Sequence, residues 1–545
     1  MNRLLKTSAR VLAALAVLAA AAVPATAASA AVSSTPYSDI NGAGSSWSAL
    51  LLDQWSSYMA TSRNLTVNFS PNGSAEGRQL YREGVEDFAA SDPPFRSGTD
   101  HLDPNGKESE LPVPYGYSYV PDTAGGTAFM YHIDVGGKEI TNLRLSPQIL
   151  MEIFTGKITN WDDPAITRIY GAKLPSLQII PVVRSDGSGA TYFFTNYMAV
   201  MFPSEWNAFC QRVPHIAFSG SCGPTEFYPE SGWNSNVKAE NGSTNLATFV
   251  KSPYANGAIG YDEYAYAKFN NIPVVKVLNP GNYFVTPTAG NVAVALTQAQ
   301  INEHPNSPNF LQQTLNNVYT YKDIRSYPFA SYSYLITPRT PGKVPSPFNS
   351  QKGRSLSTYI DYFLCAGQKD TASLGYSPLP LNLVKGGLLQ VTHIPGHVAG
   401  PNPNTLAGCP NPTFTNGVLT VLKTAPNPPK CDKLGEPLSC AGGGGGTSPS
   451  PGSSTSTGTS TAAPGSGSGT GSGSGAGNPT GSGGGATGGG GGAATDPQGQ
   501  VISLANDSAS QPVLGALTAL AIVVAIAAPP ALIIWLRRRR SQAPS

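Results

Sequence analysis

The chain has 545 residues, of which 34 are Lys or Arg and 32 are Asp or Glu, so its formal net charge is +2. So small a charge over this length provides no basic patch, and the composition therefore argues against a nucleic-acid partner. The chain is also longer than a single hydrophobic core usually supports, so we expect more than one structural unit.

Residues 1–30 have the pattern of a secretory signal peptide. Lys6 and Arg10 precede an apolar run rich in alanine and leucine, and residues 28–30 are small, as the cleavage site of such a peptide requires. A competing cleavage site lies at residues 25–27. The region contains no cysteine, which excludes a lipid-modified N-terminus. We expect the mature protein to be exported.

Residues 31 to about 400 alternate strand-like and helix-like segments, a pattern typical of an α/β protein. The expected strands are 65–69, 128–132, 178–183 and 274–277, and the expected helices include 49–59, 146–154 and 192–201. Because this region is longer than one core requires, we predict two lobes.

The first glycine-rich turn, at residues 42–47, precedes an expected helix. The free N–H groups of a helix's first turn, with the hydroxyl of Ser46, would suit an anion. A dinucleotide-binding loop is a poorer interpretation, because the third glycine is missing and no strand of useful length precedes the turn. A plain helix cap by Ser45 or Ser46 is the simpler alternative.

The second turn, at residues 72–80, contains Ser74 and has the same strand–turn–helix form. Shortly after it, Asp92 follows an apolar pair and precedes two prolines, which places it in a loop at a strand end. An ordinary turn aspartate is one interpretation. In an anion site, however, its carboxylate would repel a fully deprotonated dianion such as sulphate and accept a hydrogen bond from a ligand that keeps a proton.

The third turn, Arg184–Thr191, leads into another expected helix. Ser188, Gly189 and Ala190 would offer a hydroxyl and backbone N–H groups beside the fixed charge of Arg184. Asp186 lies two residues from Arg184 and is expected to orient its guanidinium by a bidentate ion pair. The alternative is a solvated surface salt bridge.

Six cysteines follow the predicted leader, where disulfides persist. Proximity favours Cys210 with Cys222 and Cys431 with Cys440, which leaves Cys365 with Cys409; six cysteines allow 15 pairings. Metal ligation is the poorer interpretation, because the chain has no Cys-x-x-Cys motif and Pro395 separates His393 from His397. We expect no metal and no cofactor.

The C-terminal part has three predicted segments. Residues 441–511 are almost entirely Gly, Ser, Thr, Ala and Pro, which predicts a flexible linker. The apolar run 513–536 is long enough to span a membrane, and the arginines of the basic tail 537–545 would stay cytoplasmic. We expect an exported protein anchored to the outer face of the cell membrane; a buried core helix is the poorer alternative for this run.

With these motifs in order, the chain resembles the substrate-binding proteins of bacterial phosphate ABC importers (the PstS-like family). The matching stretches are 42–46, 67–74, 87–93, 154–166, 182–195 and 260–268, and the likeness covers roughly residues 38–390. The resemblance implies a two-lobe periplasmic-binding-protein fold of type II. Its first lobe would comprise 34–114 and 262–395, its second lobe 115–261, and residues 396–440 would form a cysteine-containing extension.

The same resemblance implies a phosphate site without catalytic residues. Ser46 and Ser74 look like hydroxyl contacts, Asp92 like the acceptor of the ligand's proton, and Arg184 like the cleft arginine, which Asp186 orients. Ser188, Gly189 and Ala190 match the third loop. The family usually has threonine where Ser46 and Ala190 stand, so the change at Ala190 removes a hydroxyl donor unless Thr191 or water compensates. The predicted C-terminal anchor is a further departure.

The resemblance thus implies capture of inorganic phosphate by a monomer, by lobe closure, for an ABC permease complex. A surface-anchored protein that serves in sensing, scavenging or adhesion without a permease is the alternative. An enzyme is disfavoured because Ser188 does not lie in a Gly-x-Ser-x-Gly elbow and no histidine can be assigned as its base. Another oxyanion, such as sulphate or molybdate, is disfavoured by Asp92.

Overall fold

The structure, a computed structural model, describes residues 37–105, 109–213 and 220–439. Its centre is an eight-stranded sheet in the order β2-β1-β3-β15-β4-β10-β8-β9. The strands are β1 (Ile40–Gly44), β2 (Val67–Ser70), β3 (Phe88–Ser91), β4 (Tyr117–His132), β8 (Ile180–Arg184), β9 (Lys238–Glu240), β10 (Ala258–Glu263) and β15 (Ala330–Pro338).

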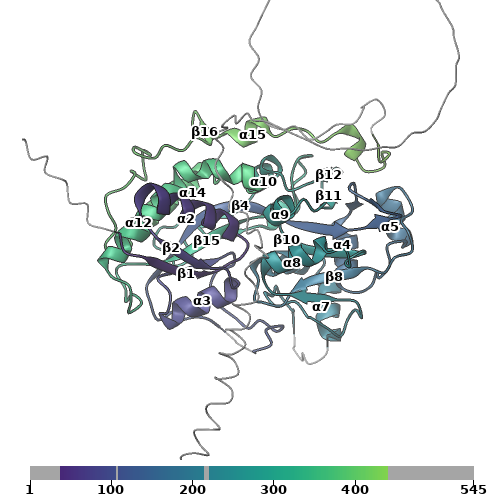
Figure 1. The fold of residues 1–545 in the computed structure, drawn as a ribbon, viewed down its shortest axis with the longest axis horizontal. Coiled ribbons are helices and arrows are strands. Elements are labelled where there is room, and N and C mark those ends of the chain that lie inside the picture. Colours follow the sequence, from purple (N-terminus) through teal and green to yellow (C-terminus); the bar gives the residue numbers. More distant parts are fainter. Residues whose placement is uncertain (1–36, 106–108, 214–219, 440–545) are drawn as a thin grey trace, which may run out of the picture. The chain divides into compact units, whose positions relative to one another are not determined.

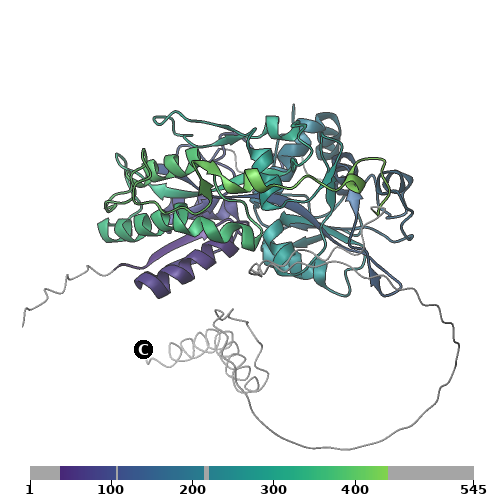
Figure 2. The same cartoon turned by 90° about the horizontal axis from the view of Figure 1, so that it is seen from above.

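The chain forms a two-lobe α/β fold. In the first lobe, β1 pairs in parallel with β2 and β3, and the helices are α2 (Ala49–Arg63), α3 (Ser74–Glu83), α12 (Ser350–Leu364) and α14 (Leu381–Val391). In the second lobe, β8 pairs in parallel with β9 and β10, and the helices include α4 (Pro147–Phe154), α6 (Gly189–Met201), α7 (Pro203–Arg212) and α8 (Gly242–Lys251). The long antiparallel strands β4 and β15 lie between the two groups of strands (Figures 1 and 2).

The alternation seen in the sequence is confirmed at the level of elements. The helices expected at 49–59, 146–154 and 192–201 are α2, α4 and α6, and the strands expected at 65–69 and 178–183 are β2 and β8 within two residues at each end. The run 128–132 is only the end of β4, which is buried along almost its whole length and begins at Tyr117. Helix α6 begins at Gly189, three residues before the expected start, because the Ser188 side chain caps it by accepting a hydrogen bond from the Thr191 N–H at 3.4 Å.

One small sheet joins segments that the sequence assigns to different lobes. Strand β11 (Lys276–Leu278) pairs in parallel with β7 (Arg144–Leu145) and antiparallel with β12 (Phe284–Val285). Strand β11, which the sequence places in the second part of the first lobe, therefore pairs with a strand from the 115–261 range. The lobe boundaries drawn from the sequence stay a prediction.

Two of the expected disulfides are present, Cys210–Cys222 beside α7 and Cys365–Cys409 at the end of α12. Cys431 is also disulfide-bonded, and Cys440 lies outside the described residues. The extension that contains Cys431 follows α14 and includes α15 (Thr420–Thr424), which contacts α10 (Ala289–Leu296) (Figure 1).

Ion pairs attach the C-terminal end of this extension to the rest of the described structure. The Asp432 carboxylate accepts hydrogen bonds from Arg144 at 3.2 Å and from Lys276 at 2.8 Å, next to the small β7–β11–β12 sheet. The predicted signal peptide, linker, membrane segment and basic tail lie outside the described residues. Within the part of the chain that the structure describes, no helix combines the length and the apolar character needed to cross a membrane.

Candidate functional site

The starts of three helices meet at the carboxylate of Asp92. Asp92 follows β3 directly, as expected, and is 1% exposed. Its oxygens accept hydrogen bonds from the hydroxyls of Ser45, before α2, at 2.8 and 2.9 Å, and of Ser74, the first residue of α3, at 3.2 Å. Gly189, the first residue of α6, lies so close that a Cβ built there would be 1.8 Å from Asp92 Oδ2. The three sequence-predicted turns thus converge from both lobes.

Arg184, the last residue of β8, lies beside this meeting point and is 1% exposed. Its Nε donates to Asp186 Oδ1 at 2.7 Å and its Nη2 to Asp186 Oδ2, which is the bidentate arrangement expected from the sequence. Nη2 also donates to the Ser46 hydroxyl at 2.8 Å. Asp186 is only 9% exposed, so the pair is buried and the alternative of a solvated surface salt bridge is wrong.

Two residues that complete the surroundings of Arg184 were not predicted from the sequence. Its Nη1 donates to Asp262 Oδ2 at 2.9 Å and to the Ser243 hydroxyl at 3.1 Å. Ser243 follows Gly242 at the start of α8, so a fourth Gly-Ser turn before a helix was the available signal. Asp262 lies in the 260–268 stretch that carries the family resemblance, but that match gave it no role.

A third residue was also missed. The Ser333 hydroxyl on β15 donates to Asp92 Oδ1 at 2.6 Å. No local pattern distinguishes Ser333 from Ser331, which is buried in the same strand. Asp92 is therefore held by hydroxyls from three separate segments, and it cannot turn away from Gly189 without losing them.

Two expectations about the first turn are wrong. Strand β1 (Ile40–Gly44) runs into this turn, although no strand of useful length was expected before it; five residues suffice because β1 pairs on both sides. The residue that caps α2 is Ser48 rather than Ser45 or Ser46, and its side chain makes no capping hydrogen bond. The hydroxyls of Ser45 and Ser46 instead point to Asp92 and Arg184, which makes this turn part of the site.

The third turn presents the start of α6 to Asp92. The N–H groups of a helix's first residues, here Gly189 and Ala190, have no acceptor within the helix. The hydroxyl of Thr191 is hydrogen-bonded to Tyr261 Oη at 2.9 Å and is fully buried. In this arrangement Thr191 therefore does not replace the hydroxyl that Ala190 lacks.

Carboxylates outnumber cations at the site. Arg184 faces Asp186 and Asp262, and Asp92 lies close enough to Asp262 for the two charges to repel. Burial raises the pKa of Asp92 from 3.8 to about 6, against the opposing effect of its hydroxyl donors. Burial also raises the pKa of Asp262, which the charge of Arg184 opposes. A surplus of negative charge favours a ligand that carries a proton over one that carries none.

These raised pKa values predict how the stability of the ligand-free protein depends on pH. The pKa values of Asp92, Asp361 and Asp122 are raised, chiefly by burial, to about 6, about 7 and about 8. The folded state therefore holds protons that the unfolded chain has already lost, so stability falls as pH rises through these values. We expect the melting temperature in phosphate-free buffer to fall between about pH 5 and about pH 8. Calorimetry checks this, and Asp122→Asn should flatten the upper part of the fall; a constant or rising melting temperature would contradict it.

The chain is similar in sequence to a described protein family and to several known proteins. A family model described as the PBP superfamily domain matches residues 25–366. The phosphate-binding protein PstS of Methanocaldococcus jannaschii is 28% identical over 367 residues, which cover 65% of this chain and 86% of that protein. The phosphate-binding protein PstS of Pasteurella multocida is 28% identical over 356 residues, 65% of this chain and 89% of that protein. Among solved structures, the phosphate-binding protein from Stenotrophomonas maltophilia is similar with a TM-score of 0.47 and 17% identity, over 69% of this chain and 99% of that one.

Proposed function

The chain belongs to the PBP superfamily, and from that premise we propose that it binds inorganic phosphate between its two lobes by clamshell closure. The observation that carries the proposal is Asp92, a buried carboxylate placed among helix starts from both lobes. The relatives named above are phosphate-binding proteins, which supports the same ligand.

In this proposal the parts of the site have distinct tasks. The N–H groups at the start of α6 and the charge of Arg184 hold the anion's oxygens. The hydroxyls of Ser46, Ser74 and Ser188 can rotate and donate to the ligand. Asp92 accepts a hydrogen bond from the hydroxyl group that phosphate keeps at neutral pH. Sulphate carries no proton at this pH, so its oxygens would face the Asp92 carboxylate without a hydrogen bond to donate.

Titration calorimetry of the full-length protein with phosphate and with sulphate tests the proposal directly. We expect phosphate to bind and sulphate to bind more weakly at neutral pH. The absence of any phosphate binding would refute the proposed ligand, and equal binding of the two anions would refute the task given to Asp92.

Asp92→Asn is expected to reduce the preference for phosphate over sulphate by about 5- to 150-fold, because an unmatched buried acceptor costs roughly 1–3 kcal/mol. The amide can donate to sulphate, which the carboxylate cannot. In the unmodified protein the preference should also shrink below about pH 6, where Asp92 takes up a proton. Both effects are read from the ratio of the two dissociation constants.

Asp361→Asn is the matched control for this substitution. Asp361 is an aspartate on α12 whose pKa burial also raises, to about 7, but its neighbour is Gly400 of the extension rather than the three turns. Asp361→Asn should therefore leave the ratio of the phosphate and sulphate dissociation constants unchanged. A ratio that falls equally in both variants would show that general destabilisation, and not the Asp92 carboxylate, sets the preference.

The setting of the binding event is also proposed. The predicted signal peptide and the apolar segment 513–536 support an exported protein held on the outer face of the membrane, and we propose that it acts as a monomer. Delivery of phosphate to an ABC-type importer is the expected use, without enzymatic turnover. Sensing, scavenging or adhesion without a permease is the alternative, and phosphate uptake by cells that lack this chain distinguishes the two: unchanged uptake favours the alternative.

A further inference from the structure

The guanidinium of Arg78 is fully buried one helical turn after Ser74 in α3. Its Nε and Nη2 donate to the two oxygens of Glu110 at 2.8 and 3.1 Å. Its Nη1 and Nη2 donate to the two oxygens of Glu226, the first at 2.9 Å, and Nη1 also donates to the Ser91 hydroxyl at 2.9 Å. Every N–H of the guanidinium is therefore used.

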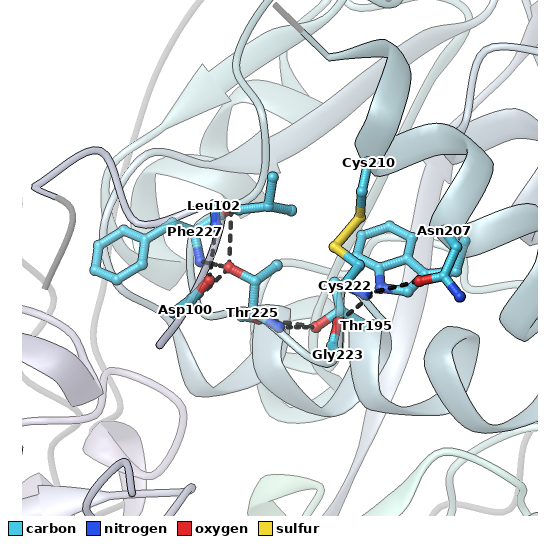
Figure 3. The surroundings of a disulfide bond; sticks show 10 residues. Asp100, Leu102, Thr195, Asn207, Cys210, Cys222, Gly223, Thr225 and Phe227 are labelled. Carbon is cyan, nitrogen blue, oxygen red and sulfur yellow. Dashed lines mark hydrogen bonds between the residues drawn. A yellow bond between two sulfur atoms is a disulfide. The ribbon is translucent and has the colours of Figure 1, made fainter. Parts of the chain in front are cut away.

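The two glutamates that share Arg78 come from different lobes. Glu110 follows β3 in the first lobe, whereas Glu226 lies between α7 and β9 in the second. A second contact crosses between the lobes at the same place. Asp100 Oδ2 accepts a hydrogen bond from Thr225 Oγ1 at 2.9 Å (Figure 3). The same oxygen accepts a second hydrogen bond from the Glu226 N–H at 3.1 Å. The Arg78–Glu226 pair therefore exists only when the lobes are together.

The segment that carries Glu226 is firmly attached to the second lobe. The Cys210–Cys222 disulfide ties it to α7, and the Cys222 N–H donates to Asn207 Oδ1 at 2.7 Å (Figure 3). Thr225 is bound to Thr195 of α6 through its N–H at 2.9 Å and its carbonyl at 2.8 Å. Movement of Glu226 is therefore coupled to movement of α6, the helix that begins at Gly189.

The same pair is directly connected to the candidate binding turns. Arg78 shares α3 with Ser74, and its partner Ser91 immediately precedes Asp92. On the other side, the Ser188 N–H donates to the Glu226 carbonyl at 2.9 Å. Docking Glu226 onto Arg78 therefore brings the second and third turns together around Asp92.

We propose that the Arg78–Glu226 ion pair is a closure clasp that holds the two lobes together and sets how long phosphate stays bound. The proposal rests on the proposed function, because it names positioning residues for that same site. A buried, hydrogen-bonded charge pair between two surfaces acts mainly on the rate at which they separate. The clasp therefore slows phosphate release and has little effect on its association.

The test compares Glu226→Gln with Glu110→Gln in the full-length protein. Both substitutions remove one carboxylate from the same guanidinium, but only the first removes a contact between lobes. Glu226→Gln is expected to raise the phosphate dissociation rate and the dissociation constant about tenfold, whereas Glu110→Gln should change them by less than about twofold. Stopped-flow release and calorimetry measure both. Equal effects of the two variants, or an unchanged release rate in Glu226→Gln, would overturn the clasp.

A readout without ligand separates failure of the clasp from failure of the phosphate proposal. Val85, after α3, is 56% exposed, and Tyr254, between α8 and β10, is 93% exposed. Dyes on Val85→Cys and Tyr254→Cys report the separation of the lobes by energy transfer, since the five described native cysteines are disulfide-bonded. Glu226→Gln should increase the mean separation and Asp100→Asn should act in the same direction. No change in either variant would overturn the clasp, whether or not phosphate binds.

Discussion

Replacement of Arg184 by methionine is expected to weaken phosphate binding by about 30-fold or more, since loss of one partner of a buried charge pair costs roughly 2–5 kcal/mol. The guanidinium is the cation nearest Asp186 and Asp262 in the described site, and it also holds the Ser46 hydroxyl. Methionine has a similar length but leaves both carboxylates without their cation. We therefore also expect the free energy of unfolding to fall by about 3–5 kcal/mol. Calorimetric titration and urea denaturation measure the two effects.

Arg325→Met is a closely matched control for this substitution. Arg325 also binds an aspartate two residues away through Nε and Nη2, at 3.0 and 2.7 Å from the Asp323 oxygens. That pair is partly exposed, with 27% and 18% of the two side chains accessible to solvent. Exposed pairs contribute about 0–1 kcal/mol, so both measurements should stay near the unmodified values. Similar losses of phosphate affinity and of stability in the two variants would contradict the role proposed for Arg184.

Gly189→Ala is expected to weaken phosphate binding by about 5- to 150-fold while leaving the ligand-free protein almost as stable as before. An added Cβ would lie 1.8 Å from Asp92 Oδ2 and 2.5 Å from Asp92 Cβ, and three hydroxyls hold that carboxylate in place. Such overpacking costs about 1–3 kcal/mol, but only while the lobes are together. Parting of the lobes relieves it, so the penalty falls on the closed, ligand-bound form. Titration calorimetry and thermal unfolding without phosphate separate the two states.

Gly98→Ala is the control, because a Cβ at Gly98 would meet nothing within 4 Å and Gly98 does not have a positive φ. Its effect on the dissociation constant should be negligible. If Gly189→Ala instead binds phosphate as the unmodified protein does, the approach of Asp92 to Gly189 is not part of the bound state. If it lowers the ligand-free melting temperature strongly, the clash acts on folding rather than on closure.

Local sequence patterns were sufficient to single out several residues of the candidate site. Ser46, Ser74 and Ser188 were found because a Gly-Ser turn before a helix is a local signal with a local cause, the free N–H groups of the first helical turn. Asp186 was assigned to Arg184 because residues two positions apart in the sequence are close in any fold. The expected cap of α2 was wrong because it depends on contacts from other segments. The hydroxyls of Ser45 and Ser46 are hydrogen-bonded to Asp92 and Arg184 instead of capping the helix.

The sequence by itself indicated the alternation of strands and helices, the local Cys210–Cys222 disulfide and the family, because these depend on composition, spacing and short motifs. Cys365–Cys409 was expected only as the pair that remained. Only the tertiary structure decided which residues surround the charges. Ser243, Asp262 and Ser333 reach Arg184 and Asp92 from segments far along the chain, and Arg78 meets Glu226 across 148 positions. The physical reason is that a buried charge takes its partners from whatever strands and helices the fold places beside it, and no local pattern encodes that choice.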